Sequence, residues 1–264
     1  MTEFRVDGMN YEEYRKYAAE YFKRQEEEFD PEGYGRCLQD IVYDDEYGEK
    51  LDLYLPEKGK ELCPLLIYVH GGGYVMGSKR SNPRPLALLD RGYAVAMIEY
   101  QKATDHPFPV QIRQLKKAIL FLKKMAVEYG IDKGKVAVYG ESAGGNLAAL
   151  AGTTGDHECF GLPETGGYGV QAVVTDFAPI NFNSIPSELK MLGRKAGTGT
   201  FAPWNYCGLY LGGFIQEHPE LAELANPETY IDNDCPPFFI KHGRINEALP
   251  YLQAVHFAES LAPM

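Results

Sequence analysis

The fold is decided by one stretch of sequence, Lys135-Val136-Ala137-Val138-Tyr139-Gly140-Glu141-Ser142-Ala143-Gly144-Gly145-Asn146-Leu147-Ala148-Ala149-Leu150. Residues 136–139 are apolar and partly β-branched, which predicts a short buried strand. Residues 146–151 are rich in alanine and leucine, which predicts a helix. The Gly140-x-Ser142-x-Gly144 pattern between them predicts a tight turn from strand to helix, because glycine has no side chain to obstruct it. Ser142 would stand at the apex of that turn, at the N-terminus of the helix, where negative charge is favoured.

This setting predicts that Ser142 is a nucleophile; the alternative is a glycine- and serine-rich turn that carries no chemistry. A serine hydroxyl is a weak nucleophile at its free pKa. It needs a histidine to take its proton, a carboxylate to orient that histidine, and hydrogen-bond donors for the oxyanion that forms. The rest of the chain has to supply these three groups.

A glycine-rich loop supplies candidate donors. Residues 64–70 are nearly all apolar, which predicts a central strand buried on both faces, and they run directly into Gly71-Gly72-Gly73. Glycine lets the backbone approach a reacting carbonyl group closely. We predict that the N–H groups of Gly72, Gly73 and Ala143 form an oxyanion hole, in which one donor is typically worth about 3 kcal/mol. His70, the residue before the glycines, is predicted to orient the loop.

Composition excludes several classes of protein. The 264 residues suffice for one domain with a sizeable core. The net charge of −11 argues against nucleic acid and anionic membranes as partners, since both require clustered positive charge. Five scattered cysteines form no Cys-x-x-Cys or Cys/His cluster, so we expect free thiols in a reducing compartment. The serine mechanism outlined above implies no metal or organic cofactor. The N-terminus lacks a signal-peptide core and no apolar run reaches about 20 residues, so a cytoplasmic protein without a membrane span is expected.

Strand and helix patterns alternate along the rest of the chain. Strands are predicted over residues 41–43, 50–56, 93–100, 170–177 and 235–243, the first two as a hairpin, and helices over 10–29, 110–129 and 251–261. In the helix over 110–129, Lys116, Lys117, Lys123 and Lys124 are predicted to face solvent. The alternation implies a mostly parallel sheet with helices on both faces.

Two segments are candidate covers for the site around Ser142. Residues 1–34 contain a helix with tyrosine and phenylalanine side chains near one face, which either packs on the body or covers a substrate pocket. Residues 181–230 are rich in glycine and aromatic residues and fit no simple unit. Long irregular insertions in compact domains are usually functional or mobile, so this one is expected to cap the site; the alternative is that it only packs.

These motifs resemble those of the α/β-hydrolase superfamily, and more narrowly of hormone-sensitive-lipase-like carboxylesterases and the related acetyl-xylan and feruloyl esterase-like group. The resemblance covers about residues 35–260 and rests on His70-Gly71-Gly72-Gly73-Tyr74, Gly140 to Asn146, and Asp105-His106-Pro107-Phe108-Pro109. It implies an α/β-hydrolase fold over residues 1–264, with His106 as a loop-structuring residue. Where the family usually has Tyr-Arg-Leu, this chain reads Tyr100-Gln101-Lys102.

The chain departs from the family at the acid of the triad. The family places an aspartate in His-Gly-x-x-Asp-x-x-x-Pro, and this chain reads His242-Gly243-Arg244-Ile245-Asn246-Glu247-Ala248-Leu249-Pro250. Asn246 carries no charge to stabilise an imidazolium, and an amide can select the wrong imidazole tautomer, which cost about 10⁴ in turnover in a serine protease. Glu247, the next residue, is the alternative acid.

The family's histidine follows one further strand, and this chain stops at Met264. The last strand, its histidine loop and the last helix are therefore expected to be missing. His256 is the only histidine after the acid position and is the remaining candidate base, although it falls within a predicted helix.

The expected function is hydrolysis of small acyl or aryl esters, including esters on plant polysaccharide, with activity in doubt because the triad is incomplete. A non-catalytic or truncated hydrolase-fold protein that only binds a ligand is the first alternative, and a serine peptidase is the second. An exposed sheet edge would also favour association into a homo-oligomer.

Overall fold

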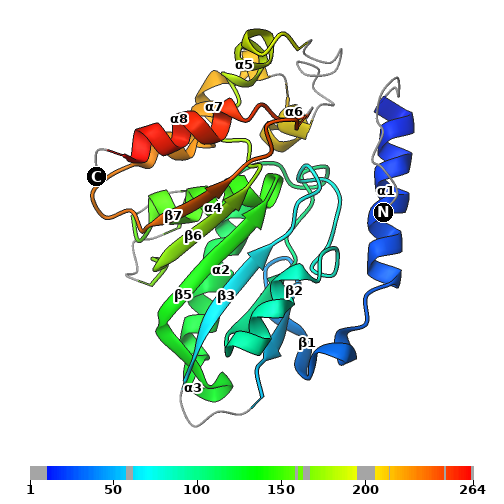
Figure 1. Ribbon diagram of the computed structural model, residues 1–264, viewed down its shortest axis with the longest axis vertical. Coiled ribbons are helices and arrows are strands. Elements are labelled where there is room, and N and C mark those ends of the chain that lie inside the picture. Colours follow the sequence, from blue (N-terminus) through cyan, green and yellow to red (C-terminus); the bar gives the residue numbers. More distant parts are fainter. Residues whose placement is uncertain are drawn as a thin grey trace.

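The computed structural model describes residues 11–57, 62–157, 160–162, 167–194, 206–213, 215–246 and 248–262 (Figure 1). Its centre is a seven-stranded sheet in the order β1-β2-β4-β3-β5-β6-β7. The strands are β1 (Arg36–Asp44), β2 (Glu49–Leu55), β3 (Cys63–Val69), β4 (Ala94–Ile98), β5 (Ile131–Glu141), β6 (Ala172–Asp176) and β7 (Phe238–Lys241). β1 and β2 form the predicted hairpin and β2 is antiparallel to β4, whereas all pairs from β4 to β7 are parallel.

Helices cover the two faces of the sheet unequally. The α-helices are α1 (Tyr11–Glu27), α2 (Val110–Lys124), α3 (Ala126–Tyr129), α4 (Ala143–Thr154), α5 (Ile185–Met191), α6 (Tyr206–Leu211), α7 (Pro219–Leu224) and α8 (Leu252–Leu261), and the 3₁₀ turns are η1 (Pro31–Tyr34), η2 (Arg84–Arg91), η3 (Ile215–Glu217) and η4 (Pro227–Tyr230). α2 and α4 pack on one face over the main core, and α8 lies beside α4. On the opposite face, η2 covers β2, β3 and β4 through a smaller apolar cluster.

The predicted helix over 110–129 is one helix only as far as Lys124. The helix is interrupted at Met125 and resumes as α3. It ends at Gly130, which adopts the left-handed conformation that favours glycine. The prediction that Lys116 faces solvent is wrong, because this side chain is fully buried. Its ammonium group donates a hydrogen bond of 2.9 Å to the carbonyl of Gly155, just after α4, so the charge caps a neighbouring helix while its stem packs in the core.

The segments after β6 gather at the end of the sheet where the parallel strands terminate (Figure 1). The described parts of the 181–230 insertion form α5, α6, η3, α7 and η4 there, and residues 195–205 lie outside the description. α1 runs along one flank of the molecule, near the same end (Figure 1). Within the described residues, no helix is both long and apolar enough to span a bilayer.

Candidate active site

A cavity of about 610 Å³ opens at the carboxyl ends of β3, β5 and β6. Ser142 lies in its wall beside the loop of three glycines. The remaining wall is mostly apolar and comes from α1, α5, α6 and the loops after β6 and β7. The lining residues are Tyr21, Phe22, Gly71, Gly72, Gly73, Tyr74, Met76, Glu141, Ser142, Ala143, Phe177, Pro179, Phe182, Ile185, Pro186, Tyr206, Cys207, Ile215, Ile245, Asn246, Ala248 and Leu249.

The turn at Ser142 is as tight as its glycines predict. Ser142 has φ 51° and ψ −121°, a backbone conformation that residues other than glycine rarely adopt. A Cβ atom at Gly140 would stand 1.9 Å from the carbonyl oxygen of Gly144, and one at Gly144 would stand 2.2 Å from that of Val69. The N–H of Ser142 donates to the carbonyl of Asp176, at 2.8 Å, which ties the turn to β6. The serine is therefore held at the first turn of α4.

The glycine loop lies against this turn. A Cβ atom at Gly71 would stand 3.2 Å from the Cβ of Ser142, and Gly72 has a φ of 111°. The carbonyl of Gly72 accepts hydrogen bonds from the N–H groups of Val75 and Met76, so it is turned into its own loop. Gly72, Gly73 and Ala143 all line the cavity. Their N–H groups have no backbone acceptor among the described residues, and they can therefore serve an anionic oxygen.

The side chains of His70, Glu99 and Lys102 contact one another and support the glycine loop. His70 is fully buried and stacks on Tyr100 with ring centroids 4.2 Å apart. Its Nδ1 lies 2.6 Å from the carbonyl oxygen of Gly71, and its Nε2 lies 3.0 Å from Glu99 Oε1. The ammonium of Lys102 lies 2.6 Å from the same carboxylate oxygen. Burial by itself would raise the pKa of Glu99, but His70 and Lys102 outweigh it and lower this pKa to about 2.

A thiol, that of Cys207, and a carboxyl group, that of Glu141, also line the cavity. Burial raises the pKa of the Cys207 thiol to about 12, so it stays protonated at neutral pH. Burial also raises the pKa of Glu141, and its carboxylate accepts a 2.8 Å hydrogen bond from the side chain of Asn82. In the described part of the chain, no three histidine, cysteine or acidic side chains converge in a metal-binding cluster.

Asn246 lies in the cavity wall, and its side chain forms hydrogen bonds within its own loop. Its Oδ1 accepts hydrogen bonds from the N–H groups of Ala248 and Leu249, at 3.0 and 2.9 Å. Because both contacts are donors, the oxygen of the amide must face them, and the Nδ2 group must face away. An NH₂ group only donates, so it cannot accept the Nδ1–H of an imidazole as a triad carboxylate does.

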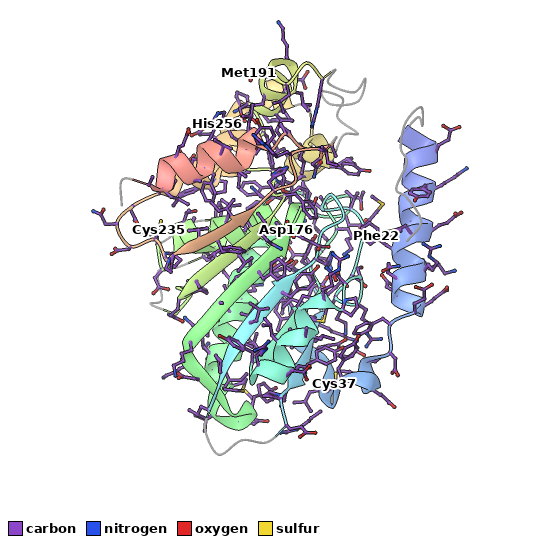
Figure 2. The ribbon with its side chains drawn as sticks, in the orientation of Figure 1. Phe22, Cys37, Asp176, Met191, Cys235 and His256 are labelled. Carbon is purple, nitrogen blue, oxygen red and sulfur yellow. The ribbon has the colours of Figure 1, made fainter. Side chains whose placement is uncertain are left out.

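None of the six histidines, all of which lie in the described part of the chain, lines the cavity. His256 lies on α8, away from the carboxyl end of β6 marked by Asp176 in Figure 2, and its Nδ1 is 2.9 Å from Glu188 Oε1. The Nε2 of His242 is 3.0 Å from the carbonyl of Leu249. His106 packs its ring edge-on against Tyr47, in the loop before α2. Glu247, the alternative acid, lies outside the described residues.

One feature of the site carries no signal in the sequence. Arg194 bonds the carbonyl oxygens of Asn246 and, at 3.0 Å, of Arg244, so it holds the loop of the acid position from fifty residues away. Arginines are common, and no local pattern marks this one as a member of the site. Phe22 of α1, which lies on the aromatic face of the helix predicted over residues 10–29, points toward the body in Figure 2 and lines the cavity.

The sequence and fold were compared with those of known proteins. The BD-FAE family model matches residues 51–261. The chain is 30% identical to the esterase LipC of Mycobacterium tuberculosis, over 84% of this chain and 54% of LipC. It is also 30% identical to a probable carboxylic ester hydrolase of the same organism, LipM, over 75% of this chain and 45% of LipM. The chain thus spans about half the length of these curated relatives.

Solved structures have a similar fold over most of this chain. A bifunctional GH43-CE protein of Bacteroides eggerthii superposes with a TM-score of 0.76 and 28% identity, over 86% of this chain and 30% of that one. A truncated form of a carbohydrate esterase from gut microbiota superposes with a TM-score of 0.75 and 24% identity, over 89% and 86% of the two chains. At 24% identity, the match with the carbohydrate esterase shows a similar fold only.

Proposed function

Because this chain belongs to the BD-FAE family and has the α/β-hydrolase fold, we propose that it hydrolyses carboxylic esters with Ser142 as the nucleophile. The observation that carries this proposal is the contact between the strained serine turn and the glycine loop, which leaves three N–H groups of Gly72, Gly73 and Ala143 on the same cavity. Relatives named as esterases support the same reaction.

The reaction proceeds through an acyl-enzyme. The Oγ of Ser142 attacks the ester carbonyl carbon and loses its proton, and the carbonyl oxygen becomes an anion that accepts hydrogen bonds from the N–H groups of Gly72, Gly73 and Ala143. The bond between carbon and the alcohol oxygen breaks, and the alcohol leaves with a proton. Water then attacks the acyl-enzyme, releases the carboxylic acid and regenerates the hydroxyl of Ser142.

The proton acceptor sets the expected rate. No histidine lines the cavity, and the Asn246 amide cannot orient one. In this chain, therefore, the serine proton goes to water or hydroxide. Loss of a triad histidine costs on the order of 10⁶ in turnover, whereas an oxyanion hole with substrate binding alone retains about 10³–10⁴ over water. We expect slow turnover, of which only a part depends on Ser142 because the oxyanion hole and substrate binding act without it.

The cavity favours small acyl or aryl esters. Its volume of about 610 Å³ is that of a small-molecule site, and aromatic, isoleucine, proline and leucine residues make up more than half of its lining. α1 and the 181–230 insertion supply part of this wall, which supports a role for both as caps. Esters of plant polysaccharides are a narrower candidate within this class.

The experiment is hydrolysis of 4-nitrophenyl acetate by the wild-type chain and by Ser142→Ala. The proposal expects wild-type turnover above buffer that the substitution lowers measurably but does not abolish, since the oxyanion hole and substrate binding remain. Equal rates for the two proteins would contradict it. In that case the better account is a hydrolase-fold protein that only binds a ligand, which the absence of a histidine from the cavity wall also favours. Titration with a non-hydrolysable aryl amide would test this alternative. Peptide substrates in the same assay test the peptidase alternative.

A further inference from the structure

Strand β1 contains a β-bulge opposite Asp52. The register of β1 against β2 shifts there, so that Gln39 and Asp40 together oppose this single residue. Asp40 has a φ of 56°, in the left-handed region, which aspartate tolerates better than most residues other than glycine. A bulge redirects the side chains of its strand, and bulges are over-represented beside active sites. The contacts of these redirected side chains therefore indicate what the bulge holds.

The bulge and Asp52 together bind Lys79 and Arg80. The ammonium group of Lys79 donates to the carboxylates of Asp40, at 2.8 Å, and of Asp52, whose Oδ1 also accepts from the N–H of Asp40 at 2.8 Å. The guanidinium of Arg80 donates to Asp52 Oδ2, at 3.0 Å, and to Gln39 Oε1, at 2.9 Å. Asp52 is fully buried and Lys79 nearly so, so solvent screens their pairing weakly. These five residues form the bulge clamp.

Lys79 connects the bulge clamp to the groups that support the glycine loop. Its backbone N–H donates to Glu99 Oε2, at 3.2 Å, and the other oxygen of this carboxylate lies 3.0 Å from Nε2 of His70. The Nδ1 of His70 lies 2.6 Å from the carbonyl oxygen of Gly71. Gly77 packs against the same two groups, since a Cβ atom there would stand 2.7 Å from that oxygen and 2.8 Å from that nitrogen. The clamp therefore reaches the glycine loop both along the chain and through Glu99.

The chain between the glycine loop and the bulge clamp is short and bonded within itself. The N–H groups of Val75 and Met76 donate to the carbonyl of Gly72, at 3.2 and 3.0 Å. The N–H of Ser78 donates to the hydroxyl of Ser81, at 2.7 Å, and the N–H of Ser81 donates to the carbonyl of Ser78, at 3.1 Å. A segment closed by such bonds can transmit a displacement of one end to the other.

We propose that the bulge clamp positions the oxyanion donors, with Lys79 as its central positioning residue. This inference rests on the proposed function, because it assigns the N–H groups of Gly72 and Gly73 to the oxyanion. None of the clamp residues lines the cavity, so they act on the reaction through the loop. The oxyanion develops only as the ester carbonyl is attacked, and donors displaced from it therefore lower kcat and leave KM nearly unchanged.

The test compares Lys79→Met with a matched control, Lys117→Met. Each substitution removes an ammonium group and keeps most of the aliphatic stem. Each ammonium group bonds one buried and one half-exposed carboxylate of the β1–β2 hairpin, which for Lys117 are those of Asp44, at 2.6 Å, and Glu46, at 2.8 Å. Lys117 makes no hydrogen bond or ion pair with residues 70–82, all of which the structure describes. The control therefore matches the loss of a hairpin ion pair and leaves the bulge clamp intact.

The first measurement is hydrogen exchange of residues 70–77, followed by mass spectrometry. Lys79→Met should speed this exchange at least about fivefold, and Lys117→Met should leave it within about twofold of wild type. Asp40→Gly, which keeps the left-handed backbone and removes the carboxylate, should act in the same direction as Lys79→Met. Unchanged exchange in both clamp variants, or an equal increase in Lys117→Met, would overturn the proposal.

The second measurement is turnover of 4-nitrophenyl acetate. Lys79→Met should lower kcat about tenfold with KM within about threefold of wild type, whereas Lys117→Met should leave both within about twofold. A kcat that Lys79→Met leaves unchanged, or a KM that rises as much as kcat falls, would overturn the proposal. Equal turnover by wild type and Ser142→Ala would contradict the proposed function instead, and hydrogen exchange, which needs no turnover, would still decide whether the clamp holds the loop.

Discussion

Glu99 shows how a single carboxylate supports the site without lining its cavity. It pairs with His70, at 3.0 Å, and with Lys102, at 2.6 Å, and His70 in turn holds the carbonyl of Gly71. The side chain of Glu99 is only 22% exposed, so solvent screens these interactions weakly. Its charge therefore contributes both to the stability of the fold and to the position of the glycine loop.

The lowered pKa of Glu99 predicts how the effect of Glu99→Gln depends on pH. A carboxyl group with a folded-state pKa of about 2, against its usual 4.5, stabilises the fold above pH 4.5, and this contribution is lost as pH falls toward 2. At pH 7 we expect Glu99→Gln to lower the free energy of unfolding by about 3 kcal/mol, and at pH 3 by about half as much. Urea unfolding at both pH values checks this. Glu128→Gln, at an exposed position of α3, is the control and should change little at either pH.

At the scale of elements, α1 is an accessory to the core. None of its described side chains belongs to the three apolar clusters that pack the sheet, and it is tethered through η1 and the ring of Phe29, which packs with Tyr34 and Tyr54. It nevertheless contributes Tyr21 and Phe22 to the cavity wall. An element of this kind can set which substrate is bound with little effect on whether the domain folds.

Phe22→Ala should therefore change substrate selection more than stability. Removing the ring exposes apolar surface of a bound aryl group, so we expect KM for 4-nitrophenyl phenylacetate to rise about tenfold, KM for 4-nitrophenyl acetate to change less than about threefold, and the urea midpoint to stay unchanged. Lys23→Ala, at the neighbouring exposed residue of α1, should alter none of these values. Equal changes of KM for the two esters would contradict the role of Phe22.

At the scale of the whole molecule, the cavity combines segments that lie far apart in the sequence. Its wall includes residues of α1, the glycine loop, the turn at Ser142 and the loops after β6 and β7. Because Ser142 and the three proposed oxyanion donors lie within one chain, the activity per mole of chain should stay constant within about twofold between about 0.1 and about 50 µM protein. Initial rates of ester hydrolysis at several dilutions measure this. A rate per chain that rises with concentration would mean that a second copy completes the site.

Much of the fold was predictable because it depends on residues close together in the sequence. The apolar run before Ser142, the glycines at 140 and 144 and the helix after them act within a single turn, and the predicted α/β-hydrolase fold is confirmed. The strand before Gly71-Gly72-Gly73 was visible for the same reason. Backbone conformation at a glycine is a local property, so a sequence pattern can report it.

The cavity wall, the side-chain direction of Asn246 and the burial of Lys116 were decided by tertiary structure alone. Arg194 meets the loop of Asn246 across fifty residues, and Lys116 reaches Gly155 across thirty-nine. Such contacts depend on how whole elements pack, and nothing in the local sequence distinguishes an arginine or lysine that makes one from those that face solvent. By itself the sequence determined the serine turn, the glycine loop and the parallel sheet, because near neighbours in the chain dictate them. The tertiary structure alone decided what surrounds Ser142, because the cavity forms where distant segments meet.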